Sequence, residues 1–167
     1  MHTENVVYIK APAKRIFSLA CDVGQWPRWL AHYRAVAVFE QSPDGSRKDV
    51  EMCAIREGFP VKGRAFPVKW RSVQVCDAAE GRIYFKHTGG IAQGMWVVWE
   101  IQSDEWGRGT RVSIAHDLTY PVDWLNGWFA RDLVGRDFVH AIAGRTLATI
   151  KALAEAEAGT MREGTGQ

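Results

Sequence analysis

Hydrophobic and polar positions divide the first part of the chain into one strand-like and two helix-like stretches. A run rich in β-branched residues at 6–10 predicts a strand, which ends before Pro12. From 13 to 23 apolar residues recur at the spacing of one helix face, and a second short helix is predicted at 25–33. The chain therefore begins with a strand followed by two short helices.

From residue 36 onward the pattern changes to alternating or β-rich runs separated by turn-forming residues. Ser42-Pro43-Asp44-Gly45-Ser46 is the clearest turn signal. The six predicted strands are 36–41, 47–56, 66–76, 82–87, 94–103 and 110–119. Short connections of this kind favour an antiparallel meander.

A helical period returns after Pro121 and persists from 125 to 158, with an apolar stripe that has to lie on the sheet. The polar, glycine-rich stretch 159–167 is predicted to be a disordered tail. No repeat or linker divides the chain, so residues 1–158 are expected to form one domain. The order of elements predicts an α+β helix-grip fold, in which a seven-stranded antiparallel sheet wraps around a long C-terminal helix.

Composition fits one globular domain with a core and room for a cavity. The 167 residues are 47% hydrophobic and 24% charged. The 21 basic and 19 acidic residues are spread along the chain, so no basic stripe indicates nucleic acid or an anionic membrane. No stretch approaches the roughly 20 apolar residues that a membrane span needs.

The three cysteines lie at positions 21, 53 and 76. Their odd number and the lack of C-x-x-C spacing argue against a disulfide framework or a zinc site, and we expect no metal. The N-terminus has no basic patch followed by an apolar run, as a secretory signal would. We therefore expect a protein of the reducing cytoplasm.

Aromatic residues are numerous, with eight Trp, seven Phe and four Tyr. Such side chains fill cores, and they also line pockets for flat apolar ligands. Both interpretations remain open from composition alone.

Three segments carry a more specific resemblance. They are Asp22–Tyr33, which contains W-P-x-x-L-x-x-Y, then Trp70-Arg71-Ser72, and Met95–Glu100. Together they resemble the aromatase/cyclases of aromatic type II polyketide synthesis, particularly the tetracenomycin kind, over about residues 4–158. The first element is shared broadly by START-like cyclase, dehydrase and lipid-transport families, and the later two narrow the resemblance.

The resemblance implies a cavity that holds a poly-β-keto chain, directs an aldol closure and promotes loss of water. It implies no metal or organic cofactor. The implied partner is a polyketide or a similar hydrophobic small molecule, delivered free or by an acyl carrier protein. Two other interpretations need the same cavity: a noncatalytic carrier of a polyketide, quinone or lipid, and a partner-binding accessory protein.

His116 is the leading candidate for proton transfer. It lies on the last predicted strand on an otherwise apolar face, and its match in related cyclases is a histidine or glutamine in the cavity. Imidazole suits proton transfer near neutral pH, so the rate is expected to titrate in that range. The alternative is a histidine that only packs in the core.

The strand 66–76 and the residues before it supply further candidates. Arg64, Phe66, Trp70, Ser72 and Gln74 share one parity, and the resemblance makes their face the cavity face. Related cyclases commonly have an arginine where this chain has Gln74. Gln74 can donate a hydrogen bond but carries no charge, which Arg64 would have to supply.

Tyr33 completes the W-P motif, and its hydroxyl either orients a carbonyl or phenol of the ligand or anchors the second helix. Contacts with the ligand are also expected from a set of aromatic and sulfur-containing side chains: Trp26, Trp29, Trp70, Met95 and Trp99. Packing is the stronger interpretation for Trp26.

His140 is a weaker candidate for a ligand contact, because it lies on the apolar stripe of the long helix but could be exposed at its edge. His2, His32 and His87 are expected to be peripheral. A hydrolase elbow, a phosphate loop and a metal-ligand motif are not found in the sequence.

Overall fold

The computed structural model describes residues 2–57, 65–90, 92–118 and 139–164. The chain starts with strand β1 (His2–Ile9), helix α1 (Ala13–Cys21), a 3-10 turn η1 (Val23–Gln25) and helix α2 (Trp26–Trp29). The remaining elements are β2 (Tyr33–Gln41), β3 (Arg47–Glu57), β4 (Ala65–Asp77), β5 (Arg82–Gly90), β6 (Trp96–Ser103), β7 (Thr110–Asp117) and α3 (His140–Gly164).

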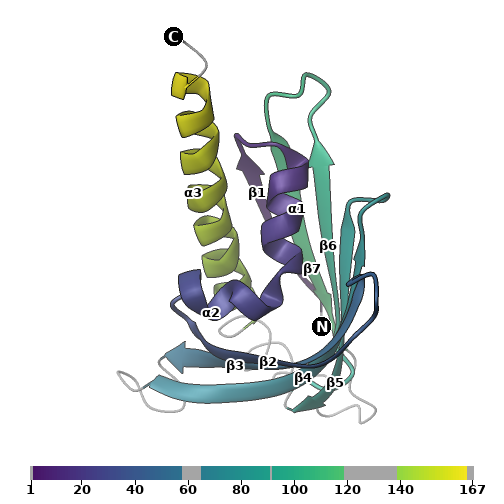
Figure 1. Cartoon of the computed structure of the whole chain (residues 1–167). Helices are drawn as coiled ribbons and strands as arrows, with labels where there is room; N and C mark the ends of the chain where they lie inside the picture. Colours follow the sequence, from purple (N-terminus) through teal and green to yellow (C-terminus); the bar gives the residue numbers. More distant parts are fainter. Residues whose placement is uncertain (1, 58–64, 91, 119–138, 165–167) are drawn as a thin grey trace.

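The strands form one seven-stranded antiparallel sheet, as predicted. Its order is β1-β7-β6-β5-β4-β3-β2. Strands β2 to β7 therefore form a continuous meander, and β1 pairs with the last of them, β7. The sheet curves strongly: β2, β3 and β4 pass beneath the helices, whereas β1, β7 and β6 stand beside them (Figure 1). Because of this curvature the sheet has a concave inner face.

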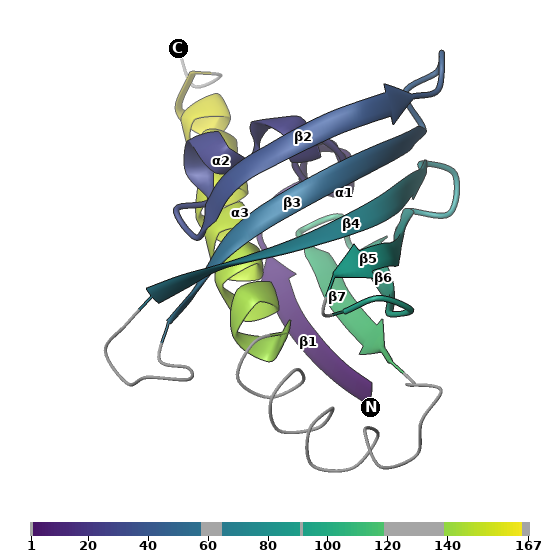
Figure 2. The ribbon, with the colours of Figure 1, turned by 90° about the horizontal axis from the view of Figure 1, so that it is seen from below.

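The helices pack against that inner face. Ile16, Leu19 and Ala20 are the buried residues of α1, and their spacing is that of one helix face. Ala143, Leu147, Ile150 and Ala154 are the corresponding buried hydrophobic residues of α3. α3 lies across the open side of the curved sheet, close to β1 and α1 (Figure 2). This arrangement is the helix-grip fold.

The helix ends differ from the predictions. α2 stops at Trp29 because Leu30 is already extended, with φ −99° and ψ 94°, and the chain turns into β2 at Tyr33. α3 continues to Gly164, so the predicted tail is wrong for 159–164. The Thr160 hydroxyl bonds the carbonyl oxygen of Ala156 within that extension. The predicted start of this helix at 125 lies outside the described residues.

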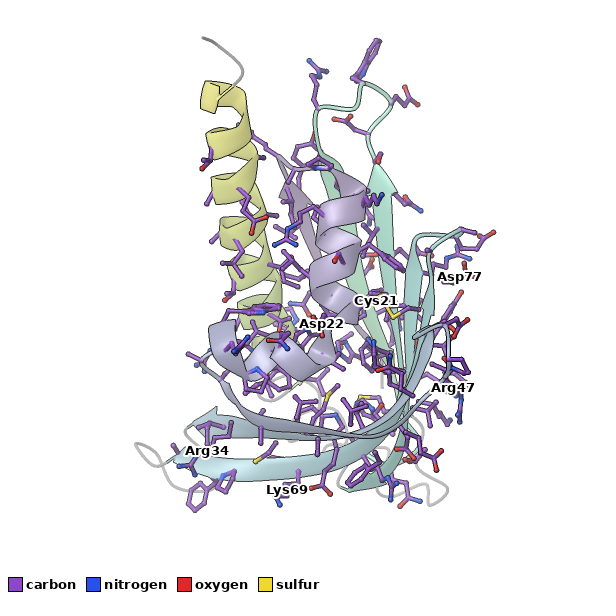
Figure 3. The ribbon with its side chains drawn as sticks, in the orientation of Figure 1. Cys21, Asp22, Arg34, Arg47, Lys69 and Asp77 are labelled. Atoms are coloured by element: carbon purple, nitrogen blue, oxygen red, sulfur yellow. A yellow bond between two sulfur atoms is a disulfide. The ribbon has the colours of Figure 1, made fainter. Side chains whose placement is uncertain are left out.

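The expectation against a disulfide is also wrong. Cys21 at the end of α1 is bonded to Cys76 on β4, with a Cα–Cα separation of 6.3 Å, inside the range of roughly 4.4–6.8 Å for disulfides. Figure 3 shows the yellow sulfur bond where α1 meets the sheet. The two residues are 55 positions apart, and only the packing of α1 on β4 brings them together. Cys53 is buried and free.

Candidate functional site

A cavity of about 60 Å³ lies between the inner face of the sheet, α2 and the first turns of α3. Its described lining is mostly apolar and aromatic. The lining residues are Trp26, Tyr33, Met52, Trp70, Phe85, His87, Ala92, Met95, Val97, Trp99, Ile114, His116, Val139, Ile142, Ala143 and Thr146. The cavity predicted from the sequence is therefore present, and Trp26, Tyr33, Trp70, Met95, Trp99 and His116 line it.

Trp26 is the centre of the aromatic wall. Its ring centroid lies 5.0 Å from that of Tyr33, 6.1 Å from that of Trp99 and 6.2 Å from that of Phe85. The indole Nε1 donates to the carbonyl oxygen of Leu19 at 3.2 Å, which fixes the ring against α1. Trp26 thus anchors α2 and also faces the cavity, so packing and ligand contact are compatible.

His116 enters the cavity from β7, where it pairs with Thr3 of β1 and with Val97 of β6. Burial, and then the nearby His87, lower the pKa of His116 to about 3. The imidazole is consequently neutral at pH 7, and the expected titration of His116 in the neutral range is wrong. Its buried Nδ1 has no hydrogen-bond partner among the described residues.

His87 is a second imidazole of the cavity. It is 9% exposed, and its Nδ1 lies 2.9 Å from the hydroxyl oxygen of Ser72. Burial, and then the charge of Lys86, lower the pKa of His87 to about 4. The prediction that His87 is peripheral is wrong, because its strand continues past residue 87 and turns this side chain inward. Ser72 does not line the cavity itself; it contacts His87 from behind.

The polar side opposite the strand histidines is formed by β2 and α3. Thr146 donates its hydroxyl proton to the carbonyl oxygen of Ile142 at 2.9 Å, and its Oγ1 lies 3.0 Å from His32 Nε2. The Tyr33 hydroxyl also bonds Thr146, while burial raises the pKa of Tyr33 far above its ordinary value. Since the Thr146 proton is engaged with Ile142, His32 Nε2 donates to Thr146 Oγ1.

His32 is therefore not peripheral, contrary to the prediction. It is 7% exposed, and burial followed by the charge of Arg145 lowers its pKa to about 4. One signal for this placement is present in the sequence, because His32 directly precedes Tyr33 in the W-P motif; the two rings lie 4.9 Å apart.

Gln74 does not line the cavity, although its parity was predicted correctly. It is completely buried, and its Nε2 donates to the carbonyl oxygen of Cys21 at 3.3 Å. Lys48, which pairs with Gln74 across β3 and β4, donates to the same oxygen at 2.9 Å. This end of the inner face lies under the end of α1, so Gln74 joins helix to sheet.

Three other predicted contacts lie outside the cavity lining, and Arg64 lies outside the described residues. Trp29 is partly buried and borders a separate surface depression beside Arg28. His140 is exposed at the start of α3, where its carbonyl oxygen accepts from Asn5 Nδ2 at 3.3 Å. Phe66 is partly buried near the start of β4. The structure places none of Trp29, His140 and Phe66 in the cavity lining.

Neither a metal cluster nor a membrane-spanning helix is found among the described residues. No group of histidine, cysteine, aspartate and glutamate side chains in this part of the chain is arranged to hold a metal ion. None of the described helices combines the length and apolar character that crossing a membrane requires.

The fold and cavity define a helix-grip protein whose inner face encloses a mostly apolar site. The family model described as polyketide cyclase/dehydrase and lipid transport matches residues 9–143. The chain belongs to this family, as the resemblance in the sequence had implied. No match was found among curated proteins.

Solved structures show the same fold at low sequence identity. The Zhui aromatase/cyclase from Streptomyces sp. R1128 has a TM-score of 0.76 and 18% identity, with 93% of each chain covered. A protein from Thermus thermophilus has a TM-score of 0.73 and 22% identity, with 94% of this chain and 99% of that one covered. The di-domain aromatase/cyclase StfQ of steffimycin biosynthesis has a TM-score of 0.75 and 21% identity; 95% of this chain matches 52% of StfQ. At these identities the likeness concerns the fold.

Proposed function

We propose that the protein is a polyketide aromatase/cyclase that binds a poly-β-keto intermediate in the cavity and promotes aldol cyclisation and dehydration. The observation that carries this proposal is the cavity itself. Its walls are aromatic and apolar, and His116 reaches it from β7, beside the edge strand β1. Flat walls suit a chain that becomes planar as it aromatises, and a polar group set in an apolar wall acts at one carbon of that chain.

In the proposed reaction His116 accepts the proton of a carbon that lies between two carbonyl groups. The electron pair of that C–H bond forms an enolate, whose carbon attacks a distant carbonyl carbon and closes the ring. The new alkoxide takes up the proton, and a later loss of hydroxide and an adjacent proton releases water. A pKa of about 3 makes His116 a weak base in the empty cavity, and a bound enolate would favour its protonated form.

Tyr33 supports this chemistry by shape and by its oxygen. Its phenol lines the cavity beside Thr146, so it would donate a hydrogen bond to a carbonyl of the ligand or accept one from an enol.

A noncatalytic carrier is the second candidate, and the position of Gln74 favours it. The residue that replaces the arginine of related cyclases is bound to Cys21 and lies away from the cavity. None of the described lining residues carries a fixed positive charge that would stabilise an oxyanion. A carrier needs only the apolar walls and a few hydrogen bonds.

The present volume sets a condition on either function. About 60 Å³ is well below the roughly 300–1,000 Å³ of sites for drug-sized ligands. Side chains of the wall or the first turns of α3 must therefore move before a polyketide enters.

The deciding experiment incubates the protein with a reconstituted minimal polyketide synthase and analyses the products by mass spectrometry. A cyclase shifts the products toward one ring-closed, dehydrated compound, and His116→Ala loses this shift while remaining folded. An unchanged product spectrum together with tight binding of the products would establish the carrier instead.

A further inference from the structure

His87 and Ser72 form a buried pair whose geometry limits which ligand groups can meet it. Ser72 lies on β4 and is 0% exposed, and His87 lies opposite it on β5. The Ser72 hydroxyl oxygen contacts two atoms: the carbonyl oxygen of Lys86 at 3.2 Å and Nδ1 of His87 at 2.9 Å. This hydroxyl has one proton for two contacts.

The proton positions follow from which atoms can donate. The Lys86 carbonyl only accepts, so the Ser72 proton must point to it if that contact is a hydrogen bond. His87 Nδ1 then carries a proton and donates to Ser72. The opposite choice, with Ser72 donating to Nδ1, leaves the Lys86 contact without a proton. Only the first choice supplies a proton to both contacts.

The surroundings of His87 disfavour the charged imidazolium, in which both ring nitrogens are protonated. His87 is enclosed by apolar and aromatic side chains, with the Trp70 ring centroid 6.0 Å away, and Lys86 on the adjacent position adds positive charge. A neutral ring with its proton on Nδ1 has a bare lone pair on Nε2. No hydrogen bond of Nε2 occurs among the described residues, and His87 lines the cavity.

We propose that His87, held by Ser72 in the Nδ1–H form, presents Nε2 to the cavity as a hydrogen-bond acceptor that selects ligands with an enol or phenol hydroxyl. The inference shares with the proposed function only the premise that the ligand binds in the cavity. It therefore applies whether the protein is a cyclase or a carrier. Ser72 is a positioning residue, because it acts through His87.

Binding of a matched ligand pair tests the proposal. 2-Naphthol and 2-methoxynaphthalene share one ring system, but only the first can donate a hydrogen bond. At pH 7, where the phenol is protonated, the unmodified protein is expected to bind 2-naphthol roughly 5- to 50-fold more tightly, as measured by calorimetry. His87→Leu should reduce this ratio to near one, and His87→Gln, which retains an acceptor oxygen, should keep part of it.

The His87→Leu comparison separates hydrogen bonding from size. If the methyl group were simply too large for the cavity, the ratio would persist in His87→Leu and the proposal would be wrong. A ratio near one in the unmodified protein would overturn it equally.

The positioning role of Ser72 is tested by measuring which ring nitrogen of His87 carries the proton. Long-range proton–nitrogen NMR correlations of the unmodified protein should show the His87 proton on Nδ1, a result that needs no variant and no turnover. A proton on Nε2 would contradict the proposal. Ser72→Ala should mix the two tautomers and lower the naphthol preference, and Ser72→Thr should restore both; an unchanged tautomer in Ser72→Ala would remove Ser72 from its positioning role.

The outcomes also separate this inference from the proposed function. Retained discrimination with no cyclisation of polyketide products would reject the cyclase and keep the His87 acceptor. Cyclisation without discrimination, or with neither naphthalene compound bound, would keep the cyclase and overturn the His87 acceptor.

Discussion

The inner face of the sheet contains two buried polar regions that differ in how their atoms are used. In the cavity region, His87 and His116 have ring nitrogens without partners among the described residues. In the region under α1, Lys48 and Gln74 donate to one carbonyl oxygen, and the disulfide of Cys21 lies beside them. The first region faces the cavity and can bond a ligand. The second uses its two donors to hold a helix, and its one unpartnered acceptor, Gln74 Oε1, lies away from the cavity lining. Burial of a polar side chain therefore does not by itself indicate a functional site.

The largest expected effect is acid destabilisation through the histidines in and behind the cavity wall. The folded pKa values of His32 and His87 are about 4 and that of His116 is about 3, below the ordinary 6.5. The unfolded chain therefore binds protons first as the pH falls, and the free energy of unfolding decreases from about pH 6.5 toward pH 3–4.

Each histidine contributes about 1.4 kcal/mol per pH unit in that window, or about 2 kcal/mol at pH 5. Urea denaturation between pH 5 and 8 measures how the free energy of unfolding changes with pH. His87→Gln should remove the contribution of one histidine, about 1.4 kcal/mol per pH unit below pH 6.5. Stability that stays constant over this range would show that these side chains are not buried as described.

The region under α1 should respond to reduction instead. Breaking the Cys21–Cys76 bond, which spans 55 positions, frees a loop and should lower the free energy of unfolding by about 4 kcal/mol. Denaturation with and without reductant measures the change. Cys53→Ser is the control, because Cys53 is free and should not alter the effect of reductant. Three titratable thiols in the denatured, unreduced protein would contradict the pairing.

His116→Ala tests the cavity region at the level of chemistry. Loss of the imidazole should reduce turnover about 10²-fold, near 2.7 kcal/mol, with little change in ligand affinity. Titration of His116 should not change the rate of the unmodified protein between pH 6.5 and 8, because the pKa of His116 lies below that range. Wild-type turnover in a folded His116→Ala protein would assign His116 to packing.

Gln74→Met should have the smallest effect. The substitution removes a 3.3 Å hydrogen bond to Cys21, but it also removes the buried Oε1 that has no partner, so the two changes oppose each other. We expect the free energy of unfolding to change by less than about 1 kcal/mol and product formation to stay the same. A selective loss of turnover in Gln74→Met would show that Gln74 acts on the ligand, and the polar groups under α1 would then not be purely structural.

The sequence predicted the fold closely because its signals are local. Alternation of apolar residues and turn chemistry are decided within a few positions, so each strand was predicted within a few residues of its observed bounds. The inward parity of Trp70, Ser72 and Gln74 was correct for the same reason.

The site was predicted less well because it depends on distant packing. Alternation shows that Gln74 points inward but not that the end of α1 covers it. His32 is covered by α3, which comes from a distant part of the chain, and His87 looked peripheral because the predicted strand ended at residue 87 whereas β5 continues to Gly90. Cys21 and Cys76 likewise meet only through the docking of α1.

The backbone at position 90 requires glycine, and this requirement bears on which ligands the cavity selects. The pairing of β4 with β5 shifts by one residue between Arg71 and Ser72, and this shift places Ser72 opposite His87. Next to it Gly90 has φ +86°, and a Cβ there would lie 2.6 Å from the carbonyl oxygen of Lys69. Any larger residue would force the two strands apart at the shift. In a collection of variants, position 90 should therefore score as a ligand-specificity position although glycine has no side chain with which to contact a ligand.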